Sequence, residues 1–350
     1  MEAVEAANAG AGTSSEPPAI ETKDLARSFG DGVDAVRGID LSIRRGEVFG
    51  FLGPNGAGKT TTVRMLCTLL PPTAGSAHVD GLDITQEGDA IRRRIGVALQ
   101  DIGLDPVQTG RELLELQCGL YGIRGENAVR RTQELLEMVD IEDAADRRVK
   151  GYSGGMKRRL DLAAALVHEP RILFLDEPTT GLDPSSRLTI WDEVRRINAE
   201  GTTVFLTTQY LEEADALCER LAIIDEGRLV AEGTPEKLKS EIGHDVVSVG
   251  LDGADPAATR SALEGLPQLE RIVEGEGSLA LFTGDGAGSV AEIVRRLDAA
   301  GLTVGAISIA RPSLDDVFLE ATGRRLSADE EARHDEAESE DRSSDGKDSR

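Results

Sequence analysis

Short segments in which apolar and polar residues alternate open the first part of the chain, and short apolar runs follow them. The alternating segments, "AIETKDLARSF" and "AVRGIDLSI", have the period of strands with one buried face and predict antiparallel strands. The apolar runs "VFGFLG", "RILFLDEP" and "TVFLTT" are typical of buried strands. Helix-period segments such as "GRELLELQCGLYGI" and "AVRRTQELLEMVDI" lie between them. Strands that alternate with helices predict a parallel α/β core over residues 19–240, with a helical subdomain at about 105–165.

A second pattern of elements begins at about residue 244. It reads strand "DVVSVGL", helix "PAATRSALEGL", strands "LERIVE" and "SLALFT", helix "GSVAEIVRRLDAAG" and strand "TVGAISIA". This βαββαβ order predicts a small α+β ferredoxin-like domain over residues 244–323, which ends in a short helix, "SLDDVFLEAT". We find no motif with a chemical role in this unit.

Both ends of the chain lack the apolar residues that a packed core needs. Residues 1–18 are rich in Ala, Gly, Ser and Glu, and residues 327–350 are almost wholly polar and charged, so we expect two disordered tails. The 350 residues, 39% of them hydrophobic, suffice for two domains. The formal net charge of −25 makes the chain a poor general binder of nucleic acid, because neutralising phosphates requires clustered Lys and Arg.

The cysteines and the lack of a long apolar segment narrow the class of protein further. Cys67, Cys118 and Cys218 are far apart and form no CxxC or Cys/His pattern, which favours a reducing, cytosolic protein without a zinc site. No apolar run approaches the roughly 20 residues of a membrane span. The N-terminus also lacks the basic and apolar regions of a signal peptide. If membranes matter, we expect another protein to supply the crossing.

The segment "GPNGAGKTT" follows the strand "VFGFL" and precedes a predicted helix, "TTVRMLCTLL". It matches the phosphate-binding pattern G-x-x-x-x-G-K-[ST] in the strand–loop–helix context that the pattern requires. Glycines let backbone N–H groups face phosphate oxygens, and the helix N-terminus adds its positive dipole end. We expect Lys59 to reach the β and γ phosphates and the Thr60 hydroxyl to bind Mg²⁺; the alternative is a glycine-rich turn without a ligand. The predicted cradle consists of Gly53, Pro54, Asn55, Gly56, Ala57, Gly58, Lys59, Thr60 and Thr61.

The strand "RILFLDEP" ends in two carboxylates. We expect Asp176 to complete the magnesium environment and Glu177 to polarise the attacking water. An acidic pair at a strand end more often caps a helix or lies in a loop, but a phosphate loop upstream reverses that preference. The two motifs together predict a nucleoside triphosphate and Mg²⁺ as ligands and hydrolysis of the triphosphate as the reaction, but they are compatible with many classes of nucleotide hydrolase.

The segment "YSGGMKRRL" places a serine and two glycines at the start of a basic, then apolar helix. Taken alone, Ser153 is a natural helix N-cap, and Gly154 and Gly155 let the backbone turn into the helix. The segment also resembles the signature sequence of ATP-binding cassette proteins. The resemblance implies that Ser153, Gly154 and Gly155 bind the γ-phosphate of ATP held by the phosphate loop of a second subunit. A homodimer would then hold two ATP molecules in equivalent sites.

Other positions match the same family in order over residues 20–240. The resemblance implies that Gln100 senses magnesium or its water, that Asp183 in "GLDP" belongs to the loop through which two subunits communicate, and that Phe29 stacks on adenine. A Phe after a strand is also consistent with a core position. The family normally places a histidine at the γ-phosphate where this chain has Gln209, which donates a hydrogen bond but cannot take up a proton. We therefore assign the base to Glu177 and only a donor role to Gln209.

The resemblance implies the phosphate-loop ATPase fold of ABC proteins, a mixed sheet with an antiparallel β subdomain and a helical subdomain. The segments "TTQYLEEAD", "YSGGMKRRLDLAAALV" and "PSLDDVFLEATGR" are similar to the ATP-binding subunits of daunorubicin-resistance-type exporters. That similarity implies efflux of a drug or other hydrophobic compound through a separate multi-span permease of the ABC-2 type. The chain itself would lie on the cytoplasmic side of the cell membrane and touch the membrane only through the permease.

Two functions from other classes remain open. One is a soluble ATP-driven switch that acts on ribosomes or DNA, although such proteins usually carry two cassettes in one chain or a long coiled coil. The other is a non-catalytic regulatory nucleotide binder, which Gln209 and the small C-terminal domain suggest. ATPase activity that is lost in Lys59→Ala would exclude the second.

Overall fold

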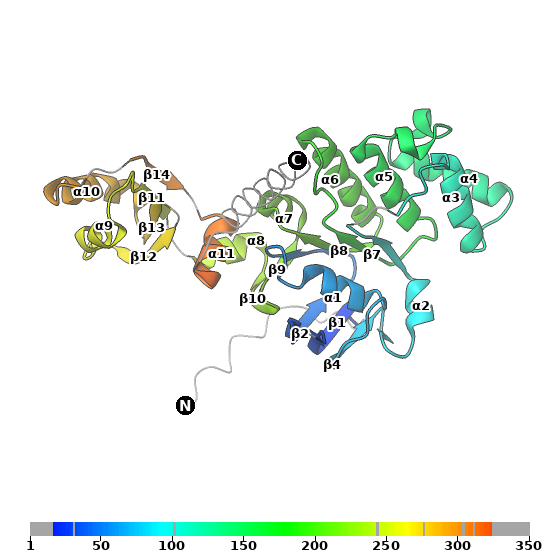
Figure 1. Ribbon diagram of the computed structural model, residues 1–350, viewed down its shortest axis with the longest axis horizontal. Helices are drawn as coiled ribbons and strands as arrows, with labels where there is room; N and C mark the ends of the chain where they lie inside the picture. The colour runs from blue at the N-terminus through cyan, green and yellow to red at the C-terminus, as the bar shows by residue number, and fades with distance from the viewer. Residues whose placement is uncertain are drawn as a thin grey trace, which may run out of the picture.

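The computed structural model covers the two predicted units but not the two predicted tails. Residues 1–16 and 324–350, which include almost all of both tails, lie outside the described residues. Figure 1 shows the C-terminal unit, with α9 and α10, at one end of the molecule and helices α3 and α4 at the other. The structure describes residues 17–30, 32–100, 103–242, 245–275, 277–302, 305–310 and 312–323.

A six-stranded sheet with the strand order β10-β9-β3-β8-β7-β6 lies at the centre of the first unit. Its strands are β3 (Val48–Leu52), β6 (Ile95–Ala98), β7 (Ile172–Asp176), β8 (Thr203–Thr208), β9 (Arg220–Asp225) and β10 (Arg228–Gly233). The first five are parallel and β10 pairs with β9 in the antiparallel direction. The three predicted apolar strands are β3, β7 and β8, which are neighbours, so their carboxyl ends meet at one edge of the sheet.

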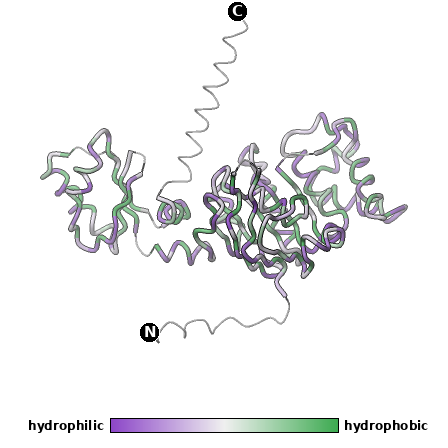
Figure 2. The backbone as a smooth tube through the Cα atoms, turned by 60° about the horizontal axis from the view of Figure 1, so that its bottom comes forward, coloured by the Kyte–Doolittle hydropathy of each residue, from purple (hydrophilic) through white to green (hydrophobic). Residues whose placement is uncertain are grey.

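Side chains of the central strands are buried on both faces of the sheet. In β3, Phe49 and Phe51 pack on one face, and Val48 and Leu52 pack on the other. This explains why the apolar runs of the sequence do not alternate with polar residues. In Figure 2, apolar segments gather in the interior of each unit.

An antiparallel sheet and helix α1 cover the face of Phe49 and Phe51. The sheet has the order β2-β1-β4-β5. Its strands are β1 (Ile20–Ser28), β2 (Asp34–Ile43), β4 (Ala74–Val79) and β5 (Leu82–Asp83). The short helices on this side are α1 (Lys59–Leu66) and α2 (Gly88–Arg92). The predicted helix "TTVRMLCTLL" is therefore too long: α1 ends at Leu66, and Thr68 has a φ of 60°, which a helix cannot contain.

Helices cover the opposite face, where Val48 and Leu52 pack. They are α3 (Gly110–Leu120), α4 (Glu126–Met138), α5 (Gly154–Ala165), α6 (Pro184–Ala199) and α7 (Leu211–Leu217), with α8 (Pro235–Glu241) after β10. Two short 3₁₀ helices, Glu142–Ala144 and Val149–Gly151, connect α4 to α5. Thr109 begins α3 with a capping box in which its side chain and that of Glu112 bond each other's backbone N–H. A central sheet with an antiparallel sheet on one face and helices on the other is the architecture that the sequence predicts for the first unit.

The C-terminal unit is the predicted ferredoxin-like domain. Its elements are β11 (Asp245–Gly250), α9 (Pro256–Leu263), β12 (Leu269–Gly275), β13 (Ser278–Thr283), α10 (Gly286–Ala299) and β14 (Ile307–Ala310). The sheet has the order β12-β13-β11-β14 and every neighbouring pair is antiparallel. Helices α9 and α10 pack on one face through Leu263, Ile293 and Leu297.

Helix α11 (Leu314–Thr322) lies between the two units (Figure 1). Its Val317 and Phe318 belong to one apolar cluster with Leu238 of α8 and Phe282 of β13. Helix α11 also contacts α7 and β10. The last helix of the chain therefore joins the C-terminal sheet to the first unit.

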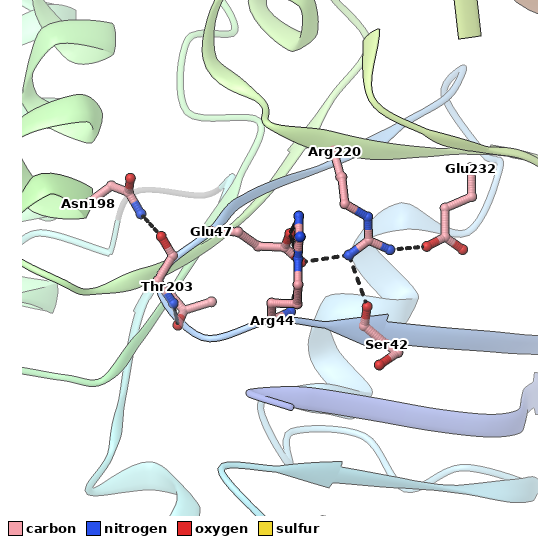
Figure 3. A network of polar contacts seen from close by, with 8 residues as sticks. Ser42, Arg44, Glu47, Asn198, Thr203, Arg220 and Glu232 are labelled. Atoms are coloured by element: carbon pink, nitrogen blue, oxygen red, sulfur yellow. Dashed lines mark hydrogen bonds and ion pairs between the residues drawn. The ribbon is translucent and has the colours of Figure 1, made fainter. Parts of the chain in front are cut away.

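A polar network fixes the turn between β2 and β3, and Figure 3 shows it around Arg220. The buried carboxylate of Glu47 accepts hydrogen bonds from Arg44 and from Arg220 Nη1, the latter at 2.9 Å. Arg220 also donates to Ser42 O and to the carboxylate of Glu232 in β10. The network joins β2 and the turn before β3 to β9 and β10 of the central sheet, and β3 leads into the predicted phosphate loop.

Candidate nucleotide-binding site

The loop between β3 and α1 forms a cradle whose backbone leaves no room for side chains at two glycines. A Cβ atom at Gly53 would lie 2.2 Å from Ile224 O, and one at Gly58 would lie 2.3 Å from Ala35 O. Gly58 also has a φ of 106°, which residues with a Cβ rarely adopt. A cavity of about 190 Å³ opens in front of this loop. It is lined by Ala35, Asn55, Gly56, Gly58, Lys59, Thr60, Thr61, Gln100 and Glu177.

Lys59 is the buried cation of the cradle. Its Nζ donates to Gly53 O at 2.7 Å and to Pro54 O at 3.1 Å, and it lies 3.1 Å from Glu177 Oε1. The side chains of Lys59 and Glu177 are only 3% and 5% exposed. A buried charge needs a partner of opposite sign. Lys59 of the loop and Glu177 after β7 are such partners for each other.

The two acidic residues after β7 have different surroundings. Asp176 Oδ1 accepts from Thr207 Oγ1 at 2.6 Å and from Thr60 Oγ1 at 3.3 Å. Asp176 Oδ2 is buried and has no hydrogen-bond partner within the part of the chain that the structure describes. Glu177 Oε2 accepts hydrogen bonds from Gln100 Nε2 at 3.3 Å and from the hydroxyl of Thr180 at 3.4 Å.

The backbone of Glu177 is held in an uncommon conformation. Its φ is 48°, in the left-handed region, and its N–H is directed at both the carbonyl and the hydroxyl of Thr207, at 3.1 and 3.0 Å. Strained backbone of this kind persists only where neighbouring contacts enforce it, and it clusters at functional sites. Thr207 therefore orients both carboxylates, because its hydroxyl also donates to Asp176.

Hard oxygen atoms suitable for Mg²⁺ meet at this point. The hydroxyl of Thr60, the carboxylate of Asp176 and the side-chain amide of Gln100 line or border the cavity. Magnesium prefers carboxylate, hydroxyl and phosphate oxygens and usually binds few protein side chains. The unpartnered Oδ2 of Asp176 is the atom that such an ion would satisfy, so the residues fit the group.

Ser153, Gly154 and Gly155 lie at the start of α5. Ser153 Oγ accepts from Met156 N at 3.2 Å, so the serine is a helix N-cap, and Ser153 and Gly154 are exposed. A Cβ atom at Gly155 would lie 2.7 Å from Ser186 Oγ, so Gly155 allows α5 to approach the start of α6. These three residues do not line the cavity at Lys59 within the same chain.

Asp183 begins α6 as its N-cap. Its carboxylate accepts from the N–H groups and the hydroxyls of Ser185 and Ser186, with both hydroxyl bonds at 2.6 Å. Hydrogen bonds from the side chains of Ser185 and Ser186 hold the pKa of Asp183 well below its ordinary range. Leu182 and Ser186, before and after Asp183 in the chain, lie near the Ser153 segment (Ser153–Gly155). Asp183 does not line the cavity at Lys59.

Known proteins match both units of the chain. Residues 36–180 match the family described as ABC transporter, and residues 233–322 match the C-terminal domain of ATP-binding proteins like DrrA1-3. The daunorubicin resistance ATP-binding protein DrrA3 of Streptomyces coeruleorubidus is 46% identical over 306 residues, which cover 87% of this chain and 96% of that protein. This chain belongs to the ABC transporter family.

Other ABC proteins agree with this assignment. The daunorubicin/doxorubicin resistance ATP-binding protein DrrA of Streptomyces peucetius is 45% identical over 92% of this chain and 97% of its own. The Nod factor export ATP-binding protein I of Paraburkholderia xenovorans is 43% identical over 88% and 98%. A solved ATP-binding cassette in a dimeric post-hydrolysis state with ADP and phosphate is 28% identical, with a TM-score of 0.57, and covers 61% of this chain and 98% of that chain. The chain is therefore an ATP-binding, ATP-hydrolysing cassette of an ABC exporter.

Two further positions predicted from the ABC family, Phe29 and Gln209, do not line the cavity at Lys59 either. Phe29 follows β1 and is 40% exposed, so the alternative of a core position is wrong. The guanidinium carbon of Arg27 lies 4.9 Å from the centroid of its ring. Gln209 follows β8, and its Oε1 is buried without a hydrogen-bond partner among the described residues. Stacking of Phe29 on adenine and donation by Gln209 both stay predictions.

Sequence reasoning missed two side chains that organise this ABC site. One is Thr207. The sequence feature that could have indicated it is the pair of threonines at the end of β8, the strand next to β7. The other is the fully buried Glu213 of α7, whose Oε1 accepts from Thr179 Oγ1 and Trp191 Nε1, both at 2.9 Å. Burial raises the pKa of Glu213 and outweighs these hydrogen bonds. No local pattern distinguishes Glu213 from its exposed neighbour Glu212.

Proposed function

We propose that this chain hydrolyses ATP in a dimer in which each cradle faces the Ser153 segment of the other copy, and that this cycle drives a separate permease. One observation carries the proposal. A buried lysine, two carboxylates and a glutamine from three distant parts of the sequence meet at one cavity behind a glycine loop. That combination of residues suits binding and cleavage of a nucleoside triphosphate.

In this mechanism Glu177 is the general base. The peptide before Glu177 bonds Thr207 and its side chain meets Gln100, so the carboxylate is aimed at the cavity that the glycine loop borders. A positioned base typically contributes about 10²–10⁴-fold to the rate. Gln209 donates a hydrogen bond from its amide without taking up a proton.

Thr60, Asp176 and Gln100 are the residues that would hold Mg²⁺. When bound, the ion neutralises charge on the phosphate oxygens. Thr207 keeps Asp176 in place by donating to its Oδ1, which leaves Oδ2 for the ion.

Ser153, Gly154 and Gly155 supply the second half of the site. Ser153 and Gly154 are exposed at a helix N-terminus, where backbone N–H groups and the helix dipole favour an anion. Two copies related by a twofold axis bring each segment to the other chain's cradle, because such an interface repeats every contact twice. Asp183 caps the helix whose Ser186 lies next to Gly155, and it is one residue through which the two copies communicate.

The permease is proposed to dock in a groove that begins at Leu99, directly before Gln100. The groove has a volume of about 360 Å³ and includes Leu104, Leu113 and Tyr121. Exposed Leu116 and Leu120 of α3 extend its apolar surface. Among the described residues no helix is both long and apolar enough to cross a bilayer. We therefore assign the crossing to a partner.

Relatives suggest the cargo and the type of partner. They are named for resistance to daunorubicin and doxorubicin and for export of Nod factor. On that basis we propose that the partner is a multi-span permease of the ABC-2 type, that it exports a drug or another hydrophobic compound, and that this chain lies on the cytoplasmic face of the membrane.

The deciding experiment is purification of the Glu177→Gln protein with Mg-ATP from mildly solubilised native membranes, followed by mass spectrometry. We expect one multi-span protein to accompany the chain. Tyr121→Glu in the groove should abolish this association, whereas Val294→Glu on the exposed side of α10 should not. Recovery of ribosomal proteins, or of the chain alone, would instead favour the soluble switch.

ATPase activity is measured on the unsubstituted protein and on two lysine variants of it. Lys59→Ala should abolish the activity, and Lys23→Ala, which removes an exposed lysine of β1, should leave it unchanged. An unsubstituted protein without ATPase activity would favour the regulatory nucleotide binder.

A further inference from the structure

Arg158, in the second turn of α5, is a buried cation that no part of the proposed mechanism uses. It is 4% exposed. Its guanidinium donates to Pro178 O and to Asp176 O, both at 2.9 Å, and to Leu99 O at 2.5 Å. Asp161, one turn further along α5, lies 3.4 Å from Nη1. One side chain therefore joins α5 to two other segments of the site.

The three carbonyl groups are not arbitrary acceptors. Asp176 and Pro178 are the residues on either side of Glu177, and Leu99 directly precedes Gln100. Arg158 thus holds the backbone before and after the general base as well as the backbone that leads to the glutamine. Burial lowers the pKa of Arg158, and such a cost is sustained only where the buried donors are well matched.

Arginine is the side chain that suits this position. Its planar guanidinium presents five donors in a fixed fork, whereas lysine has a single flexible ammonium group. The three carbonyl oxygens can each accept from a different N–H group of the planar guanidinium, and they match the ammonium group of a lysine less well. The contacts of neighbouring Arg159 differ: it donates to Val139 O at 3.0 Å and to Asp140 O at 2.7 Å, at the end of α4.

We infer that Arg158 is a positioning residue that links the Ser153 helix to Glu177 and Gln100. The inference rests on the proposed function, because it assigns Glu177 as the base and Ser153 to the other copy's ATP. Ser153 and Arg158 lie on the same helix, so a shift of α5 on contact with the partner's ATP is carried to the base of the chain's own site. The two sites of the dimer are connected through this side chain.

The test is steady-state ATPase kinetics of Arg158→Lys, with Arg159→Lys as the matched control. Both changes keep the charge and act on adjacent residues of one helix. We expect Arg158→Lys to lower kcat by about tenfold or more, because small displacements of a catalytic group are costly. The KM for ATP should stay within about threefold, since the cradle is unchanged. Arg159→Lys should keep kcat within about twofold.

Nucleotide-binding sites are counted in each preparation by titration with a fluorescent ATP analogue, and kcat is expressed per site. A purely structural role would lower the number of sites or the melting temperature but not kcat per site. An unchanged kcat per site in Arg158→Lys overturns the inference while the proposed function stands. If the unsubstituted protein has no ATPase activity, the proposed function itself is overturned.

A second variant covers the case in which Arg158→Lys does not fold. Asp161→Asn leaves the arginine in place and removes the carboxylate beside its Nη1. We expect kcat per site to fall by about two- to fivefold at unchanged KM, because the fork is then less firmly held. A kcat equal to that of the unsubstituted protein would overturn the inference.

Discussion

The contact between Lys59 and Glu177 predicts that Glu177→Gln binds ATP more tightly than the unsubstituted protein. The carboxylate lies 3.1 Å from Nζ, and both side chains are buried. A phosphate oxygen must compete with this carboxylate for the ammonium group. A hydrogen bond to a charged group contributes about 1.5–3 kcal/mol; the ion pair with Glu177 lies at the upper end of this range, and a bond from the ammonium group to a neutral amide oxygen lies at the lower end. Replacing the carboxylate by an amide therefore weakens the competitor by roughly 1–2 kcal/mol, which corresponds to about 5- to 30-fold in affinity.

The assay is calorimetric titration with Mg-ATP, with hydrolysis measured on the same samples. We expect the dissociation constant to fall by about 5- to 30-fold and kcat to fall by about 10²–10⁴-fold. The control is Glu241→Gln, which removes a carboxylate from an exposed ion pair with Lys237 and should change neither value. If kcat fell while the dissociation constant stayed the same or rose, Glu177 would not compete with the phosphates for Lys59, and the reasoning would be refuted.

Three further predictions follow from other contacts. Gly58→Ala should weaken nucleotide binding more than about tenfold without a change in circular dichroism, because a Cβ would lie 2.3 Å from Ala35 O; ordinary binding would contradict the role of the loop. Gln209→His should change turnover by less than about tenfold, since Glu177 is the base; a larger gain in the ATPase assay would show that the histidine matters. Asp80→Asn should lower the free energy of unfolding in urea by roughly 1–3 kcal/mol at pH 7, because it removes a buried carboxylate that pairs with Arg94 and two other partly exposed arginines. Burial raises the pKa of Asp80, but hydrogen bonds from its arginines outweigh burial and hold the pKa below its ordinary value, so the difference should shrink as the pH falls below about 4.

Local chemistry made the phosphate loop, the acidic strand end and the helix N-cap at Ser153 predictable from the sequence. Each is a short pattern in which the residues that act together are neighbours in the chain. The βαββαβ order of the C-terminal unit was likewise sufficient to predict its fold. Turn residues and hydrophobic periods fix the order of the elements, and few topologies satisfy that order. The strands β7 and β8 were recognised for the same reason, as uninterrupted apolar runs.

The contacts that orient the site were not predictable, because they join residues far apart in the sequence. Thr60 and Asp176 are separated by 116 positions, and Arg158 and Leu99 by 59. An arginine on a helix is usually exposed, and only the packing of α5 against β6 and the turn after β7 shows that Arg158 is buried. Glu213 was missed for the same reason, since its partners lie on two other elements.

If the proposed dimer forms, the arrangement of these contacts explains why one chain carries two different halves of a site. The cradle at Lys59 is bordered by residues that suit a phosphate and a base, and the Ser153 segment begins the helix that carries Arg158. If the Ser153 segment contacted the ATP of its own chain, α5 and Glu177 would respond to the same ATP molecule. Arg158 would then couple no second site to the base. In the proposed twofold dimer the segment would meet the ATP of the other chain, and the same three hydrogen bonds would make hydrolysis at one site depend on the occupant of the second. Arg158→Lys should therefore reduce the cooperativity of ATP hydrolysis together with kcat, a combination that loss of a base alone does not produce.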